Sequence, residues 1–231
     1  MGSLKYLAAG FLAIAVAIGF AGSAQAAPIP WSNPNGTAGD FFWSNGQSDN
    51  GLFGSPTLVG NSFLFFPSGF VATSSNGVAV GISDRLEVDL LLKPGKSLTG
   101  FAVNELGDYS ILGAGGTVSA TGLLVVANTD PNGGGQVVSD TLHTNPAMPI
   151  VGPGSGAWTG NSSVTILPNG WTQVHIVLNN VLQATSLANS TSTIQKKFVR
   201  GGVEITLIVP EPVSISAVGL AGTLLLIRRR K

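Results

Sequence analysis

Residues 82–92 read ISDRLEVDLLL, and this stretch decides the fold class. From position 85 to position 90, charged and apolar side chains alternate strictly. Because successive side chains of a β-strand point to opposite faces, this period of two predicts a strand with one face in a core and one in water. Residues 93–96, KPGK, follow it with proline and glycine in the positions that a turn favours.

Short apolar, β-branched or aromatic segments recur along residues 27–209, and clusters of Gly, Asn, Ser and Thr separate them. We expect strands over residues 61–66, 70–73, 78–80, 82–92, 98–104, 117–127, 136–143, 163–167, 171–178, 193–199 and 203–209. About ten strands without helical patterns between them predict an all-β fold, an antiparallel β-sandwich with jelly-roll-like connections.

Two regions of this β-sandwich domain are weakly specified by their sequence. Residues 27–60 carry several Gly-, Asn- and Ser-rich loops, and we expect a terminal strand and a long loop there. Residues 144–162 are rich in Gly and Pro, which predicts a second long loop. Segments 163–167 and 171–178 flank Pro-Asn-Gly, a spacing that predicts a hairpin.

Composition narrows the classes of function. The chain has 231 residues and no cysteine, which excludes a disulfide scaffold, a thiol enzyme and thiolate metal sites. It carries eleven basic and eleven acidic residues, but five of the basic residues and one acid lie in the terminal segments. The body 27–209 therefore keeps six basic and ten acidic residues, a net charge of −4. A net negative charge does not favour binding to the phosphate backbone of a nucleic acid.

The N-terminal segment 1–26 is typical of a secretory signal peptide. Lys5 supplies the positive charge, an uncharged apolar stretch follows, and Ala24 and Ala26 form a small-x-small site. We expect cleavage before Ala27. The alternative is an uncleaved N-terminal membrane anchor.

The C-terminus has three parts: Pro210-Glu211-Pro212, the uncharged run 213–227, and a cluster of cations. The cations are Arg228, Arg229, Arg230 and Lys231. As a helix, the apolar run would be about 22 Å long, against a hydrocarbon core of about 30 Å. The terminal cations would stay on the cytoplasmic side. We therefore expect a C-terminal hydrophobic helix that enters the membrane at least transiently.

This order of parts resembles the PEP-CTERM sorting signal of proteins exported by Gram-negative bacteria that make extracellular polysaccharide. The resemblance covers residues 210–231 only. It implies that exosortase, a membrane-embedded transpeptidase-like enzyme, recognises and removes the tail. It also implies residence at the cell surface or in the extracellular matrix of a biofilm. A permanent single-span anchor is the alternative.

Catalytic patterns are absent from the sequence. No serine has glycine at both flanking positions that a nucleophile elbow needs. His143 and His175 are interpreted as partly exposed sheet residues. A glycosidase would need two carboxyl groups at a fixed separation, which no local spacing provides. The acids weighed for such a pair are Glu87, Asp89, Glu105, Asp108, Asp84 and Asp140. We expect a non-enzymatic protein.

Two weaker signals concern ligands. Asn128, Asp130 and Asn132 form the front half of a calcium loop, but the twelfth position of that loop lacks its acid, so an ordinary turn is the alternative. We expect no cofactor other than calcium at these residues. Trp158 lies in a Gly-rich stretch, where an exposed ring would bind a sugar, although buried tryptophan is commoner.

The remaining basic cluster of the body, Lys196, Lys197 and Arg200, is interpreted as a solvated edge. Together these observations predict an exported structural or adhesive protein of the cell surface or polysaccharide matrix. A carbohydrate-binding module, calcium-dependent through residues 128–132, is the alternative. The expected partners are the secretion machinery, exosortase, the membrane through the C-terminal helix, and extracellular polysaccharide.

Overall fold

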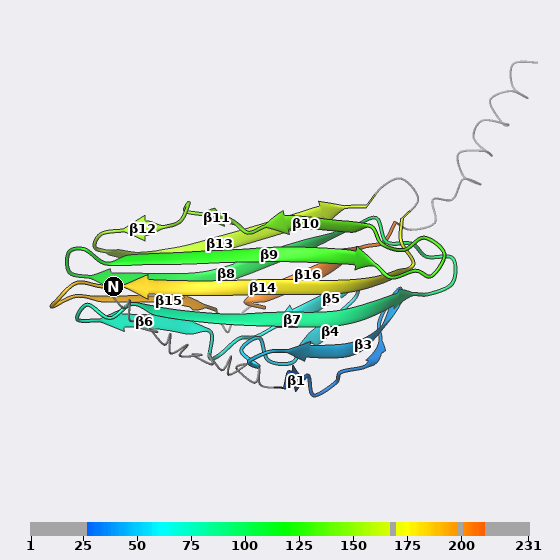
Figure 1. Ribbon diagram of the computed structural model, residues 1–231, viewed down its shortest axis with the longest axis horizontal. Coiled ribbons are helices and arrows are strands. Elements are labelled where there is room, and N and C mark those ends of the chain that lie inside the picture. The colour runs from blue at the N-terminus through cyan, green and yellow to red at the C-terminus, as the bar shows by residue number, and fades with distance from the viewer. Residues whose placement is uncertain (1–26, 167–169, 198–200, 211–231) are drawn as a thin grey trace, which may run out of the picture.

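The computed structural model describes residues 27–166, 170–197 and 201–210, which form two facing antiparallel sheets (Figure 1). No residue in these ranges is helical, and among them no helix is long and apolar enough to span a membrane. Ala27 and Pro210 are both exposed. The other predicted cleavage and sorting residues lie outside the described residues: Ala24, Ala26, Glu211, Pro212, Arg228, Arg229, Arg230 and Lys231. The predicted signal peptide and the predicted helix 213–227 lie outside them too.

Sheet A contains eight of the sixteen described strands, in the order β1-β3-β7-β14-β9-β10, with β2 beside β3 and β12 beside β9. Its pairings are all antiparallel. The strands are β1 (Ile29–Pro30), β2 (Gly36–Thr37), β3 (Phe41–Ser48), β7 (Val80–Leu92), β9 (Thr117–Asn128), β10 (Val137–Thr141), β12 (Ile150–Val151) and β14 (Gln173–Thr185).

Sheet B contains the other eight described strands, in the order β11-β13-β8-β16-β5-β4, with β15 between β8 and β6. Its pairings are antiparallel as well. The strands are β4 (Thr57–Val59), β5 (Ser62–Phe65), β6 (Val71–Ser75), β8 (Gly100–Leu112), β11 (His143–Asn145), β13 (Gly154–Thr165), β15 (Thr191–Lys196) and β16 (Val203–Ile208). The prediction of an all-β antiparallel fold is therefore confirmed.

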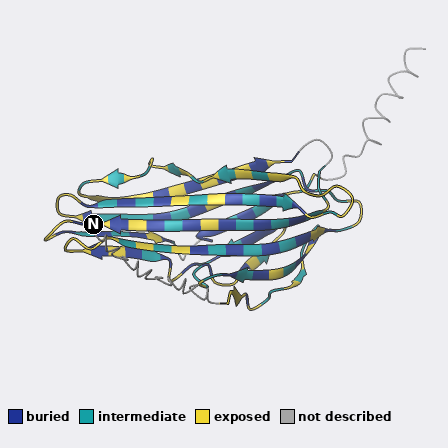
Figure 2. Cartoon of the chain, in the orientation of Figure 1, coloured by how far each residue is buried: buried dark blue, intermediate teal, exposed yellow. Residues whose placement is uncertain are grey.

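The core lies between the inner faces of the two sheets. Leu86, Val88 and Leu90 of β7 are buried, while the charged residues between them lie on the outer face, as the alternation predicted. The same stripes of buried and exposed residues run along the other long strands (Figure 2). A cluster of aromatic rings fills part of this core: Trp31, Phe41, Trp43, Phe53, Phe63, Phe65 and Phe70. Each tilted or edge-to-face contact stabilises the fold by about 0.5–1.5 kcal/mol, in addition to the stabilisation from burying the surface of the rings.

The two weakly specified regions contain more strand than the sequence predicted. Residues 27–60 hold β1 to β4 instead of one strand and a long loop. Residues 144–162 hold β12 and most of β13. β13 pairs with β8 over its whole length. Hydrogen bonds to the backbone of β8 therefore hold this Gly-rich segment as a strand, although its own sequence predicted a loop. The predicted hairpin is wrong, because β13 belongs to sheet B and β14 to sheet A.

Candidate functional site

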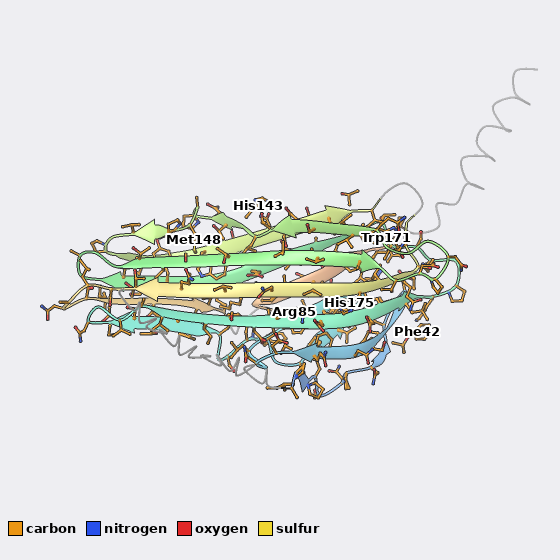
Figure 3. The ribbon with its side chains drawn as sticks, in the orientation of Figure 1. Phe42, Arg85, His143, Met148, Trp171 and His175 are labelled. Carbon is orange, nitrogen blue, oxygen red and sulfur yellow. The ribbon has the colours of Figure 1, made fainter. Side chains whose placement is uncertain are left out.

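A hollow of about 350 Å³ opens on the outer face of sheet A, where the segment 146–151 lies against β9. We call it the sheet A hollow. Met148 lines the hollow, and its label in Figure 3 shows at which end of the molecule the hollow lies. Its walls are Thr117, Ser119, Ala120, Thr121, Met148, Pro149, Gln183 and Thr185.

The strand register brings the polar groups of the hollow together. Thr117, Ser119 and Thr121 are alternate residues of β9, so their side chains lie on the same face. On β14, Gln183 lies opposite Ser119 and Thr185 lies opposite Thr117. The Ser119 hydroxyl donates a hydrogen bond to Gln183 Oε1 at 3.4 Å.

The segment that carries Met148 and Pro149 forms the other wall of the hollow. The Ala120 N–H donates to the Met148 thioether sulfur at 2.9 Å, and the Met148 N–H donates to Thr144 Oγ1 at 3.2 Å. Ile150 then pairs with Val118, which joins the segment to β9. The wall is therefore held by hydrogen bonds to side chains around Met148 and by strand pairing at Ile150.

The lining of the hollow is uncharged and mostly apolar, with a few polar groups. It combines hydroxyl groups and one carboxamide with the apolar Met148 and Pro149, and no lining residue carries a charge. Ligand sites typically join apolar walls with a few placed polar groups. This lining suits a small uncharged ligand with both apolar and hydroxyl surface, whereas a phosphate or nucleic acid would need cations.

Trp158 is not available to a ligand, and the prediction of an exposed ring there is wrong. The residue is 1% exposed and points into the core from β13. It lies opposite Gly107 of β8, and a Cβ on Gly107 would fall 2.1 Å from the indole. The large ring is buried because its cross-strand neighbour has no side chain.

The loop with the predicted calcium ligands is built as a pair of Asx turns. Asn128 Oδ1 accepts a hydrogen bond from the Asp130 N–H at 3.0 Å, and Asp130 Oδ1 accepts one from the Asn132 N–H at 2.8 Å. The Thr172 hydroxyl donates to the other Asp130 oxygen, and this bond, more than any other contact, lowers the pKa of Asp130. Among the described residues, no three His, Asp or Glu side chains gather as a metal site would require. Calcium binding stays a prediction.

Asp84, one of the acids weighed for catalysis, anchors a loop. Its buried carboxylate accepts hydrogen bonds from the backbone N–H groups of Asn50 at 2.8 Å and Leu52 at 2.7 Å. It also accepts one from the Phe53 N–H at 3.3 Å. Charged acceptors bind backbone donors strongly, so this aspartate holds the loop in front of β7 and keeps Phe53 in the core.

The other weighed acids each have a charged or ionisable partner in the structure. The pairs are Arg85–Glu87, His175–Asp89 (2.7 Å), His143–Asp140 (3.1 Å), Lys197–Asp108 (3.1 Å) and Lys196–Glu105. Both histidines are partly exposed sheet residues, as predicted, and Figure 3 labels them on the two sheets.

One buried group was not predicted from the sequence, and we call it the buried triad: Lys196, Glu105 and Asn180. The prediction that Lys196 lies on a solvated edge is wrong, since its side chain and that of Glu105 are 0% exposed. A local signal existed: in TSTIQK, residues 191–196, Lys196 is in phase with Ile194, which is fully buried. Alternation would have placed both side chains inside.

Glu105 joins the other two members of the triad. Its Oε2 contacts Lys196 Nζ, and its Oε1 accepts a hydrogen bond from Asn180 Nδ2. Lys196 Nζ also lies 5.3 Å from the ring centre of Phe70 and 5.4 Å from that of Trp158. Burial lowers the pKa of the Lys196 amine, although Glu105 opposes the shift.

No protein family matches the chain, and no curated protein matches its sequence. Among solved structures, the chain is similar to the carbohydrate-binding module TmCBM61 in its complex with β-1,4-galactotriose. The sequence identity is 11% and the TM-score is 0.23, over 77% of this chain and 97% of the module. A likeness this remote carries no argument about the function of the chain.

Proposed function

We propose that this protein is an exported, non-enzymatic structural or adhesive component of the surface or the extracellular polysaccharide matrix of a Gram-negative-type bacterium. The observation that carries the proposal is the three-part C-terminus that begins with Pro210-Glu211-Pro212, in a chain with a signal-peptide pattern at its start. Exosortase would recognise the tail after export, while the tail holds the chain in the membrane, and would then remove it.

The body of the protein supports a structural role. The chain folds around a large core without disulfides, and long strands that follow one another, such as β7 and β8, lie in opposite sheets. This change of sheet supports the jelly-roll-like arrangement. The acids that a hydrolase would need are held by backbone donors or basic side chains, which supports a non-enzymatic body.

The intact mass of the protein recovered from its native host tests the sorting proposal. We expect a mature chain that begins at Ala27 and ends near residues 209–212. A Glu211→Gln variant should retain the terminal cations, whereas the control Glu204→Gln, outside the motif on β16, should be processed normally. Wild-type protein that keeps its last four residues would contradict exosortase processing and indicate a permanent anchor.

The sheet A hollow favours a second candidate function, carbohydrate binding. A sugar is neutral and carries many hydroxyl groups, which match the hydroxyl and carboxamide groups of the lining. The pyranose ring could lie against Met148, whose polarizable thioether adapts to irregular apolar surfaces. This function is compatible with residence in a polysaccharide matrix.

Binding of neutral polysaccharides by the body 27–209, measured by calorimetry, tests this candidate. Gln183→Ala should weaken binding at least several-fold. The matched control is Gln173→Ala, because Gln173 lies at the opposite end of the same strand. Equal binding by the two variants would contradict a site in the hollow. A chelator added to the same assay tests the predicted calcium dependence.

A further inference from the structure

The buried triad joins the two sheets across the core. Asn180 comes from β14 of sheet A, whereas Glu105 and Lys196 come from β8 and β15 of sheet B. The side chains of Lys196 and Glu105 are 0% exposed, and Asn180 is 0% exposed as a residue. One carboxyl group therefore holds an amine and a carboxamide from facing sheets, away from water.

This arrangement is costly if it serves only to fill the core. Buried charges lose their hydration, and apolar residues of similar volume often do as well in their place. The carbonyl oxygen of Asn180 is also buried without a hydrogen-bond partner. An incompletely satisfied buried polar group requires an explanation.

The chemistry of the three groups in the buried triad supplies this explanation. A lysine amine is a nucleophile when it is neutral, and burial favours its neutral form. The carboxyl group of Glu105 contacts the amine through one oxygen and the amide nitrogen of Asn180 through the other. It is therefore placed to take a proton from the nucleophile and to deliver a proton to the nitrogen that leaves. The rings of Phe70 and Trp158 flank the amine.

We propose that Lys196 and Asn180 form an intramolecular isopeptide bond, with Glu105 as the catalytic residue. Lys196 Nζ transfers a proton to Glu105 and attacks Cγ of Asn180. The Nζ–Cγ bond forms and the Cγ–Nδ2 bond breaks. Glu105 returns its proton to the leaving nitrogen, and a second proton from Nζ completes the released ammonium ion. Nothing is oxidised or reduced, and no co-reactant is needed.

The bond would link β14 to β15, and so sheet A to sheet B, through a closed loop of residues 180–196. It would form after folding, because only the folded core brings the three side chains together. The inference goes beyond the proposed function: it concerns a covalent modification within the body and does not depend on the fate of the tail or on ligand binding.

Peptide mapping of the full chain, purified and denatured before digestion, tests the proposal. We expect chymotrypsin, which cuts at Leu182 and Leu187, to leave a branched peptide in which Asn180 and Lys196 are joined. Its mass should be lower by one ammonia than the sum of the two linear peptides. Trypsin should cut after Lys197 but not after Lys196. Linear peptides with unmodified Lys196 and Asn180 would overturn the proposal.

Variants assign the roles of the three residues. Lys196→Arg and Asn180→Ala should abolish the branched peptide, and Glu105→Gln, which keeps the size but removes the acid, should reduce it at least tenfold. The matched control is Asn179→Ala, an exposed neighbour on the same strand, which should leave the bond intact. A branched peptide that persists in Glu105→Gln would overturn the catalytic role of Glu105.

A succinimide at an Asn-Gly pair, such as Asn76-Gly77, also lowers the mass by one ammonia. Fragmentation of the branched peptide in the mass spectrometer must therefore show which residues are joined. Only the isopeptide bond joins two segments and blocks trypsin at Lys196. The wild-type digest decides the proposal even if a core variant fails to fold. A mass loss carried by a linear Asn-Gly peptide alone would overturn it.

Discussion

Lys196 and Lys197 are neighbours in the chain, and each pairs with an acid of β8, but they lie in opposite environments. Lys196 and Glu105 are fully buried, whereas the side chains of Lys197 and Asp108 are 31% and 40% exposed and lie 3.1 Å apart. Water screens the outer pair, so its attraction contributes little. The inner pair has lost its hydration, so its energy depends on every group around it. Position in the sandwich, rather than the type of residue, gives the inner lysine its reactivity.

The largest difference between the two pairs should appear when each lysine is removed. Lys196→Met leaves Glu105 buried and unpaired, which costs about 3–5 kcal/mol. Where the cross-link has formed, the loss of the closed loop takes the place of this cost, at about 3 kcal/mol for a loop of this size. Lys197→Met should cost about 1 kcal/mol or less. Urea unfolding measures both free energies, and similar losses in the two variants would contradict the contrast.

Trp158 forms part of the wall around the inner lysine, and its removal should be the next largest effect. Trp158→Ala opens a cavity over Gly107 and should cost about 3–5 kcal/mol. The control is Trp171→Ala, whose ring is only partly buried. Thermal unfolding compares the two, and a smaller loss for Trp158 than for Trp171 would be inconsistent with its buried position.

Replacing both inner charges separates an ion pair from a cross-link. If the two groups formed only an ion pair, Glu105→Leu with Lys196→Met would be neutral or stabilising by about 1–4 kcal/mol. We expect instead a loss of about 3 kcal/mol, because the closed loop disappears. Urea unfolding of the double variant decides between these results, with the outer double variant Asp108→Leu with Lys197→Met as the control.

The smallest effect concerns a surface pair and its pH dependence. Lys96 Nζ lies 2.8 Å from Asp40, and this hydrogen bond is the main cause that lowers the pKa of Asp40 below its ordinary value of 3.8. A folded-state pKa below the unfolded one stabilises the protein above pH 3.8, and this contribution is lost as the pH falls through the folded value. The Tm of Asp40→Asn should therefore lie slightly below wild type at pH 6. The two should converge near pH 2, and a constant difference would contradict this origin.

Local patterns predicted most of the β architecture. The alternation in residues 82–92 identified both a strand and its inner face, because period two is a property of the strand itself. The turn that begins at Asn128 was equally local, and the structure shows β9 and β10 pairing across it. The same rule would have placed Lys196 inside with Ile194, but its charge indicated the surface.

Long-range contacts decided what local patterns could not. Residues 154–162 are rich in glycine and predicted a loop, yet they form a strand because β8 pairs with them along their length. The burial of Trp158 depends on Gly107, about fifty positions earlier in the chain, which leaves room for the ring. The sheet A hollow likewise requires β9, β14 and the segment around Met148 to meet.

The sequence by itself determined the strand periodicity, the absence of cysteine and the motifs at the two ends, since each is a property of neighbouring residues. The tertiary structure alone decided that Glu105, Asn180 and Lys196 share one buried site. These residues lie on three strands of two sheets, and their meeting depends on strand order and register. Both are set by packing over the whole core, because burying the inner faces of the two sheets fixes how every strand is aligned.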